Sequence, residues 1–325
     1  MLSRRAALGL LATVCLAPAP AFAQRDTPVR VAVLTITSSQ ASVPMRTLKQ
    51  RLNELGYVDG RSLTLDFVSA DGRVDRLPDL AAGLVARRPA VILALGGAEP
   101  VFAVRKATSA IPVVFTIATD PVADGLVGSL ARPGRNITGV SSLNAELDAK
   151  RLELIKEVLP ATRRVALIVN SVDRTSTSAR ERAETAARRL GLQLEAVEIA
   201  APAEIEAVIG RARAIAEAAL LLGTPFFYPH LQRVGALAAK HRLPLIAPWR
   251  ELPAAGGLMS YGTNIQEIFR RAAGMADRIL KGTQPGDMPV EQPTTFEFVF
   301  NARAAAALGV TVSPALLTRA DTVLR

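Results

Sequence analysis

Small and polar residues follow several apolar runs in this sequence, where the chain passes from an extended segment into a helical one. Such residues leave backbone N–H groups free at a helix start, and these groups can hold a carboxylate. Ligands of open α/β sheets sit at the carboxyl ends of the strands, so these residues are candidate binding groups. They are Thr37, Ser38 and Ser39, then Gly97 and Ala98, Thr119 and Asp120, Asn170, and Thr224.

Aromatic and acidic residues near the later strand ends could complete such a site. One helix end contributes about 0.3–1 kcal/mol of favourable electrostatic free energy to a bound carboxylate. Micromolar binding needs a binding free energy of about −8 kcal/mol. The remainder must come from burying an apolar or aromatic ligand body, with Phe226, Trp249 and Tyr261 as candidate walls. Asp120 or Glu251 could hold an ammonium group. For each residue taken singly, an ordinary role in a loop is a better interpretation than a role in binding. Only the convergence of these residues predicts a site.

Sequence motifs of catalysis and metal binding are absent from this chain. It has no G-x-S-x-G and no strand followed by G-x-G-x-x-G. The glycines at 134 and 139 have the spacing of a phosphate loop, but Val140 stands where that loop requires lysine. The two histidines, His230 and His241, are eleven residues apart. We therefore expect no metal, no cofactor and no enzymatic activity.

Extended and helical patterns alternate in two series along the chain. The first series contains apolar runs at 29–36, 62–69, 91–95 and 113–117, with helical stretches between them. This alternation is typical of βαβ units, which form parallel sheets. A stretch rich in Gly, Pro, Asn and Ser, residues 131–144, then precedes a second series of the same kind. Two α/β units joined by a crossing are the simplest interpretation.

The order of these units predicts an α/β fold of two Rossmann-like lobes with parallel sheets, joined by a three-crossing hinge. A chain that leaves a lobe, returns and leaves again places the strand ends of both lobes at one cleft. We expect lobe 1 at residues 24–140 plus 249–286, and lobe 2 at residues 141–248 plus 287–325. The crossings are expected near 138–142, 247–250 and 285–290.

The first 23 residues have the pattern of a signal peptide. Arg4 and Arg5 form a charged start, residues 6–16 are apolar, and residues 21–23 read Ala-Phe-Ala, a cleavage signal. The arginine pair fits either Sec or twin-arginine export. Cys15, the only cysteine, follows Val14, which disfavours a lipid anchor. The sequence thus predicts an exported, cysteine-free protein of the bacterial periplasm.

The charge pattern indicates a solvated basic surface and no nucleic-acid partner. The net charge is +10, but basic residues are spread along the chain. Many stand at helical spacing from acidic ones, as Glu184 and Arg188 do. No dense basic run is interleaved with aromatic residues, the pattern that nucleic-acid binding requires. Beyond the N-terminus no stretch of about 18 apolar residues suggests a membrane span.

Several long blocks of the sequence resemble a known family, the substrate-binding proteins of ABC transporters, which includes tryptophan-binding receptors. The resemblance implies a type I periplasmic-binding fold, a ligand held in the cleft between the lobes, and delivery to a membrane permease and its ATPase. Membrane contact would come only through that permease, and we expect a monomer. Asn170-Ser171-Val172 departs from the Asn-Pro usual in similar sequences, which leaves the ligand's identity open. The blocks are ELGYVDGRSLTLDFVSADGRVDRLPDLAAGLV, TDPVADGLVGSLARPGRNITGVSSL, AKHRLPLIAPWRELPAAGGLMSYG and MPVEQPTTFEFVFN.

The hypothesis from the sequence is an exported receptor of an ABC importer that binds a small carboxylated ligand. Aromatic or other apolar amino acids suit the candidate walls. Two alternatives use a similar two-lobe frame: a periplasmic enzyme, and a sensing module that reports to a membrane partner. Recovery of the ligand unaltered would argue against the enzyme, and a permease encoded alongside would argue against the sensor.

Overall fold

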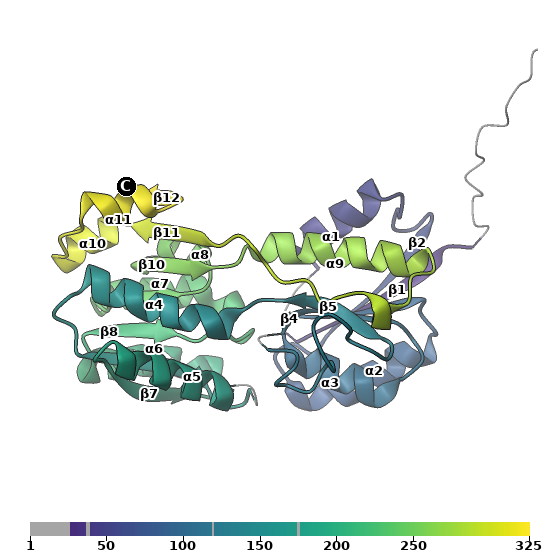
Figure 1. Ribbon diagram of the computed structural model, residues 1–325, viewed down its shortest axis with the longest axis horizontal. Coiled ribbons are helices and arrows are strands. Elements are labelled where there is room, and N and C mark those ends of the chain that lie inside the picture. The colour runs from purple at the N-terminus through teal and green to yellow at the C-terminus, as the bar shows by residue number, and fades with distance from the viewer. Residues whose placement is uncertain (1–26, 37–39, 119, 174–175) are drawn as a thin grey trace, which may run out of the picture.

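The computed structural model describes residues 27–36, 40–118, 120–173 and 176–325, which form two α/β lobes (Figure 1). Each lobe is built on one sheet with helices against both faces. This is the two-lobe architecture that the alternation of strands and helices predicts. The expected signal peptide, residues 1–23, lies outside the described residues, as do the candidate ligand residues Thr37, Ser38, Ser39 and Thr119.

Lobe 1 contains a five-stranded parallel sheet in the order β2-β1-β3-β4-β5. Val31 and Val33 of β1 pack toward α1 and α9, while Ala32 and Leu34 join the cluster formed with α2 and α3. Both faces of the sheet are covered, which explains its nearly continuous apolar strands. The elements are β1 (Val29–Thr35), α1 (Val43–Glu54), β2 (Leu63–Ser69), α2 (Leu77–Ala86), β3 (Val91–Leu95), α3 (Ala98–Ala107), β4 (Val113–Ala118), β5 (Ile137–Ser141) and α9 (Ile265–Leu280), with 3₁₀ turns η1 (Val74–Arg76) and η4 (Pro285–Asp287).

Lobe 2 contains a seven-stranded sheet in the order β12-β11-β10-β9-β8-β6-β7. All neighbouring strands are parallel except β10 and β11, which are antiparallel. One face packs on α4, α5 and α11, and the other on α6, α7 and α8. The elements are α4 (Asn144–Val158), β6 (Arg164–Asn170), α5 (Ser176–Arg189), β7 (Gln193–Ile199), α6 (Ile205–Ile215), β8 (Ala218–Leu221), α7 (Leu231–Lys240), β9 (Leu245–Ala247), α8 (Glu251–Ala254), β10 (Met259–Gly262), β11 (Glu297–Asn301), α10 (Ala302–Leu308), α11 (Pro314–Arg319) and β12 (Thr322–Leu324), with η2 (Pro202–Glu204) and η3 (Tyr228–His230).

Three segments connect the lobes. The chain leaves lobe 1 after β5, returns between β10 and α9, and leaves again before β11. The third segment starts beside β5, where the Ser141 N–H donates to the Glu291 carbonyl at 3.0 Å and the Glu291 N–H donates to the Gly139 carbonyl at 2.9 Å. Figure 1 shows these connections along one side of the molecule.

The second and third crossings lie later in the chain than we expected. Residues 249–262, expected in lobe 1, belong to lobe 2 because β10 pairs with β9 and β11. Trp249 and Leu252 are buried in that lobe's core, so this Pro- and Gly-rich stretch is a continuation of lobe 2 and not a linker. Residues 287–291, expected in lobe 2, remain with lobe 1, where Met288 and Val290 are buried.

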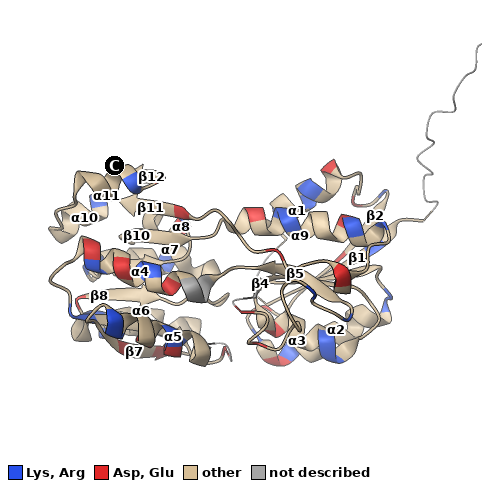
Figure 2. Cartoon of the chain, in the orientation of Figure 1, with Lys and Arg blue, Asp and Glu red and all other residues tan. Residues whose placement is uncertain are grey.

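Charged residues of both signs are interspersed over both lobes (Figure 2). Within the described ranges, no helix combines the length and the apolar character that a membrane crossing requires.

Candidate ligand-binding cleft

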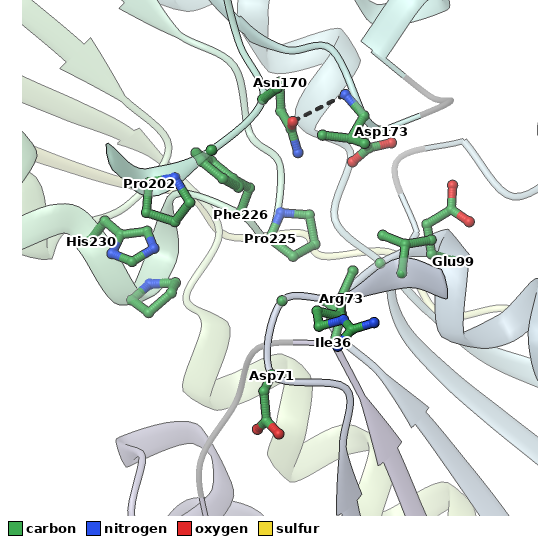
Figure 3. Close-up of a pocket in the computed structure, with 18 of the residues that line it drawn as sticks. Ile36, Asp71, Arg73, Glu99, Asn170, Asp173, Pro202, Pro225, Phe226 and His230 are labelled. Carbon is green, nitrogen blue, oxygen red and sulfur yellow. Dashed lines mark hydrogen bonds between the residues drawn. The ribbon is translucent and has the colours of Figure 1, made fainter. Parts of the chain in front are cut away.

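A cavity of about 630 Å³ lies between the two lobes (Figure 3). Lobe 1 lines it with the segments that follow β1, β2 and β3, and lobe 2 with those that follow β6, β7 and β8. The carboxyl ends of both parallel sheets therefore meet at one place, as the hinge arrangement predicts. The lining residues are Ile36, Asp71, Gly72, Arg73, Val74, Asp75, Gly96, Gly97, Ala98 and Glu99 of lobe 1, and Asn170, Val172, Asp173, Ala200, Ala201, Pro202, Pro225, Phe226, Pro229 and His230 of lobe 2.

The lobes touch each other beside this cavity. A β-carbon at Gly97 of lobe 1 would lie 2.8 Å from Cγ of Pro225 in lobe 2. Gly97 has a φ of +118°, a value that other residues rarely adopt. Its N–H donates to the Thr116 carbonyl of β4 at 3.1 Å, which fixes the turn between β3 and α3. The lobes can approach this closely at position 97 because glycine has no side chain.

Carboxylates from both lobes line one side of the cavity. Glu99 lies in the first turn of α3, where the helix dipole favours a negative charge, and is only 8% exposed. Asp173 follows β6 in lobe 2, and Figure 3 shows the two carboxylates on the same side of the cavity. Asp71 and Asp75 also line the cavity, where Asp71 pairs with Arg76 at 3.0 Å and Asp75 with Arg73 at 2.7 Å. This side suits a cationic ligand group.

Apolar rings line the other side of the cavity, all from lobe 2 (Figure 3). Phe226 packs against His230, with ring centroids 5.8 Å apart. Burial, with a smaller effect from Arg233, lowers the pKa of His230, so its imidazole is neutral at pH 7. The prolines at 202, 225 and 229 add rigid apolar surface. This side suits an apolar or aromatic ligand body.

Four of the predicted binding residues lie at the cavity: Gly97, Ala98, Asn170 and Phe226. Asn170 is 7% exposed, and its Oδ1 accepts from the Val172 N–H at 3.2 Å. That bond fixes the orientation of the amide, so that its NH₂ group remains a donor toward the cavity (Figure 3).

Five of the predicted residues do not line the cavity. Thr224 is buried beside Pro225, and its Oγ1 has no hydrogen-bond partner. Asp120 accepts from the Ala123 N–H at 2.9 Å and so stabilises a turn. Trp249 is 4% exposed in the core of lobe 2, where it contacts Tyr228.

The remaining two of these five hold parts of lobe 2 together. Glu251 accepts from the Tyr228 hydroxyl at 3.1 Å, and this carboxylate and burial raise the pKa of Tyr228. Tyr261 packs against Phe298, and its carbonyl accepts from Arg151 Nε at 2.7 Å. Both side chains contribute to packing within lobe 2, and neither lines the cavity.

The sequence reasoning missed the residues after β2 and β7. Residues 71–75 follow β2, residues 200–202 follow β7, and both segments line the cavity. The rule that ligand groups follow strand ends would have found them, had it been applied to all strands. Glu99 lies four residues after the end of β3, and Asp173 lies three residues after the end of β6.

A family model matches residues 30–324 of this sequence, and it describes an ABC transporter substrate binding protein. The chain belongs to this family. Its fold is that of the type I periplasmic binding proteins. Within the described residues no group of three or more His, Cys, Asp and Glu side chains could hold a metal ion.

A tyrosine-binding relative and several solved structures are similar to the chain. A tyrosine-binding protein of Clostridioides difficile is 26% identical over 257 residues, 79% of this chain and 74% of that one. The crystal structure of a conserved domain protein from Vibrio cholerae is 26% identical with a TM-score of 0.85, covering 91% of this chain and all of that one.

Two other solved structures differ in the state they record. An ABC domain from Streptococcus pneumoniae in complex with L-Trp is 24% identical with a TM-score of 0.84, covering 92% of this chain and all of that one. The ligand-free, open structure of a substrate binding protein from Clostridium difficile is 22% identical with a TM-score of 0.65, covering 91% of this chain and 99% of that one.

Proposed function

We propose that this chain is the exported receptor of an ABC importer, and that it binds an amino acid with an aromatic or apolar side chain in the cleft between its lobes. The observation that carries the proposal is the division of the cavity into a carboxylate-lined side and an apolar side. A zwitterion with an apolar body matches both sides at once. The tyrosine-binding relative and the L-Trp complex support this ligand class.

In this proposal each part of the ligand has its own partner in the cavity. The ammonium group would lie near Glu99 and Asp173, since charge-assisted hydrogen bonds to carboxylates are about twice as strong as neutral ones. The carboxylate would accept from the Asn170 amide, and the side chain would pack on Phe226. The cavity volume of about 630 Å³ falls within the range of about 300–1,000 Å³ typical of small-molecule sites.

Binding would be coupled to closure of the lobes. A ligand that touches both lobes favours the closed arrangement, and a shift from about 1% to 99% closed needs roughly 5.5 kcal/mol of preference. Contacts from Glu99 on lobe 1 and from Asn170 and Phe226 on lobe 2 divide that preference between the lobes. The contact of Gly97 with Pro225 supports a closed arrangement in this structure.

Membership of the family supports delivery of the ligand to an importer. The closed receptor would carry its ligand to a permease and its ATPase, as a monomer in the periplasm. Residues 1–23 would direct export by the Sec or twin-arginine route.

The test begins with the ligand that copurifies with the protein. Mass spectrometry of the denatured protein should identify an amino acid, chemically unaltered after incubation. Calorimetry should then show binding of L-tryptophan or L-tyrosine. It should show weaker binding of tryptamine, which lacks the carboxylate, and weaker binding of indole-3-propionate, which lacks the ammonium group. Conversion of the ligand to a product would instead support an enzyme.

One variant and a matched control test the role of Glu99 as the partner of the ammonium group. E99Q should weaken L-tryptophan binding about 10- to 100-fold, since hydrogen bonds to charged groups contribute about 1.5–3 kcal/mol. The same variant should leave indole-3-propionate binding nearly unchanged, because that compound has no ammonium group. Equal loss for both compounds would contradict the assignment of Glu99. E153Q changes an exposed carboxylate far from the cavity and is the matched control.

A further inference from the structure

Four charged side chains from both lobes form a cluster that the proposed ligand contacts do not fully use. Asp120 and Asp124 belong to the loop after β4 in lobe 1. Asp173 and Arg182 belong to lobe 2, the first after β6 and the second on α5. Here we name this group the Asp124 cluster. Asp173 also lines the cavity, so the cluster adjoins the cleft.

Two atoms of this cluster are buried without a hydrogen-bond partner among the described residues. One is Oδ2 of Asp124 in lobe 1, and the other is Nε of Arg182 in lobe 2. Arg182 Nη2 has only a long contact, 3.5 Å, with the Ser178 hydroxyl. A buried carboxylate oxygen without a donor is costly when ionised, and protonation removes most of that cost.

The charges that act on Asp124 come from both lobes. Asp120, in its own loop, repels a negative charge at Asp124, and so does Asp173 from lobe 2. Arg182 from lobe 2 attracts it. Arg105 of α3 approaches the same loop, but its guanidinium donates to the Gly125 carbonyl. Arg182 and a hydrogen bond from the Asp120 backbone favour the ionised form, but burial, the largest effect, together with the charge of Asp120 outweighs them and favours the protonated form.

We propose that Asp124 takes up a proton as the lobes close, so that closure on a ligand is coupled to proton binding and is favoured at mildly acidic pH. The ligand part of this proposal rests on the proposed function. The coupling itself is a property of the two lobes. When they separate, Asp124 loses Asp173 and Arg182 of lobe 2 and becomes hydrated, so its proton affinity falls toward that of a hydrated carboxyl group that keeps Asp120 as its neighbour.

The direction and size of the effect follow from linkage. Burial, and next the charge of Asp120, raise the pKa of Asp124 from 3.8 to about 6 in the closed arrangement. A group with a higher pKa in the closed state favours that state below this pKa, and the advantage disappears as the pH rises above it. With the open-state pKa nearer the ordinary value, the apparent affinity should be up to about fourfold higher at pH 5.5 than at pH 7.5.

The ligand-free protein provides the first test, with spin labels at Ser109→Cys in lobe 1 and Arg189→Cys in lobe 2, in a C15A background. Both positions are exposed. Electron–electron distance measurements should show a larger closed population at pH 5.5 than at pH 7.5. D124N cannot titrate, so its populations should be the same at both pH values. A shift of equal size in D124N, or no shift in the unsubstituted protein, would overturn the proposal.

Calorimetry with L-tryptophan and L-tyrosine provides the second test. Binding at pH 6.5, measured in buffers of different ionisation enthalpy, should show proton uptake that D124N abolishes. Binding without proton uptake would refute the coupling and leave the receptor function standing. Absence of binding to both amino acids would refute the ligand class, while the distance measurement would still decide the coupling.

Two further variants distinguish titration of Asp124 from a general effect of the substitution. R182Q removes the attracting charge, so the pH midpoint of closure should move upward. D120N removes a repelling charge, so the midpoint should move downward. Shifts in the same direction for both variants would contradict an electrostatic origin.

Discussion

Gly97 of lobe 1 and Pro225 of lobe 2 meet across the cleft so closely that a β-carbon at position 97 would lie 2.8 Å from the Pro225 Cγ. Both residues line the cavity. The turn before α3 therefore combines two features: it exposes a helix start to the cavity, and it stands at a contact between the lobes. A glycine is needed for both its φ of +118° and its lack of a side chain.

G97A should weaken ligand binding by hindering closure. The substitution adds strain at a positive φ, about 1–2 kcal/mol, and a clash with the opposite lobe. We expect at least a tenfold loss of affinity for the copurifying amino acid, measured by calorimetry, with the protein still folded. The double variant G97A/P225A should recover part of the loss, because the proline ring is the clashing group.

G134A is the matched control for this change. Gly134 also has a positive φ, +72°, but nothing lies within 4 Å of a β-carbon there. It should lose a similar amount of stability and keep the affinity of the unsubstituted protein. If both variants lost affinity equally, strain and not interlobe contact would be the cause.

The fold was predictable because local patterns decide it. Apolar runs such as β3 and the alternation with amphipathic helices specify parallel sheets without reference to distant contacts. The position of the second crossing, after β10 and not near residue 249, was not predictable from such patterns. A stretch with Pro248, Pro253, Gly256 and Gly257 has the composition of a linker. Only the pairing of β10 with β9 and β11, a tertiary property, shows that the stretch belongs to lobe 2.

W249A should destabilise the protein and leave ligand binding nearly intact. The indole is 4% exposed and packs against Tyr228, with centroids 6.1 Å apart. Removing a buried aromatic ring costs about 3–5 kcal/mol of unfolding free energy. Urea unfolding measures that loss, and calorimetry at low temperature measures affinity. F226A is the matched comparison, because Phe226 is partly exposed to the cavity: it should lose affinity with a smaller loss of stability.

The candidate site was predictable in part, for a related reason. Strand ends mark where ligands bind, so Gly97 and Asn170 could be named without a structure. Which aromatic residues face the cleft depends on the lobe to which each segment belongs. Trp249 and Tyr261 follow or lie in strands of lobe 2, but their side chains pack within that lobe. The incorrect assignment of residues 249–262 to lobe 1 therefore also led to the incorrect choice of Trp249 and Tyr261 as walls of the cleft.

Removal of Arg151 should strongly destabilise lobe 2. Arg151 and Asp148 on α4 form an ion pair with Nη1 and Oδ1 2.5 Å apart, and both side chains are almost completely buried. Burial lowers the pKa of Arg151, and the Asp148 charge opposes that effect. R151M leaves the Asp148 carboxylate buried without this cation, so we expect a loss of about 3–5 kcal/mol in urea unfolding.

The double variant D148L/R151M is the control, since replacing both charges by apolar groups is often nearly neutral. It would retain far more stability than R151M if the buried charge is the main cost. Equal losses would show that Arg151 acts mainly through its hydrogen bond to the Tyr261 carbonyl, which ties α4 to the end of β10 next to a crossing.

E217Q should lower stability at neutral pH and matter less in acid. The Glu217 carboxylate accepts from the backbone N–H groups of Arg163 and Arg164, at 3.1 and 2.7 Å, and from the Arg164 guanidinium. It thereby joins the starts of β6 and β8. The backbone hydrogen bond from Arg164 is the largest cause that lowers the pKa of Glu217 from 4.5 to about 2.

The sign of the pH dependence follows from this depressed pKa. Stability from Glu217 is fully present above pH 4.5, the ordinary value, and is lost as the pH falls through about 2. Because its side chain is 40% exposed, we expect only about 1 kcal/mol at pH 7. Urea unfolding should show less than about half of that difference at pH 3. E206Q, which removes an exposed partner of Lys240 without backbone contacts, should change stability less at pH 7, and a pH-independent effect of E217Q would contradict the assignment.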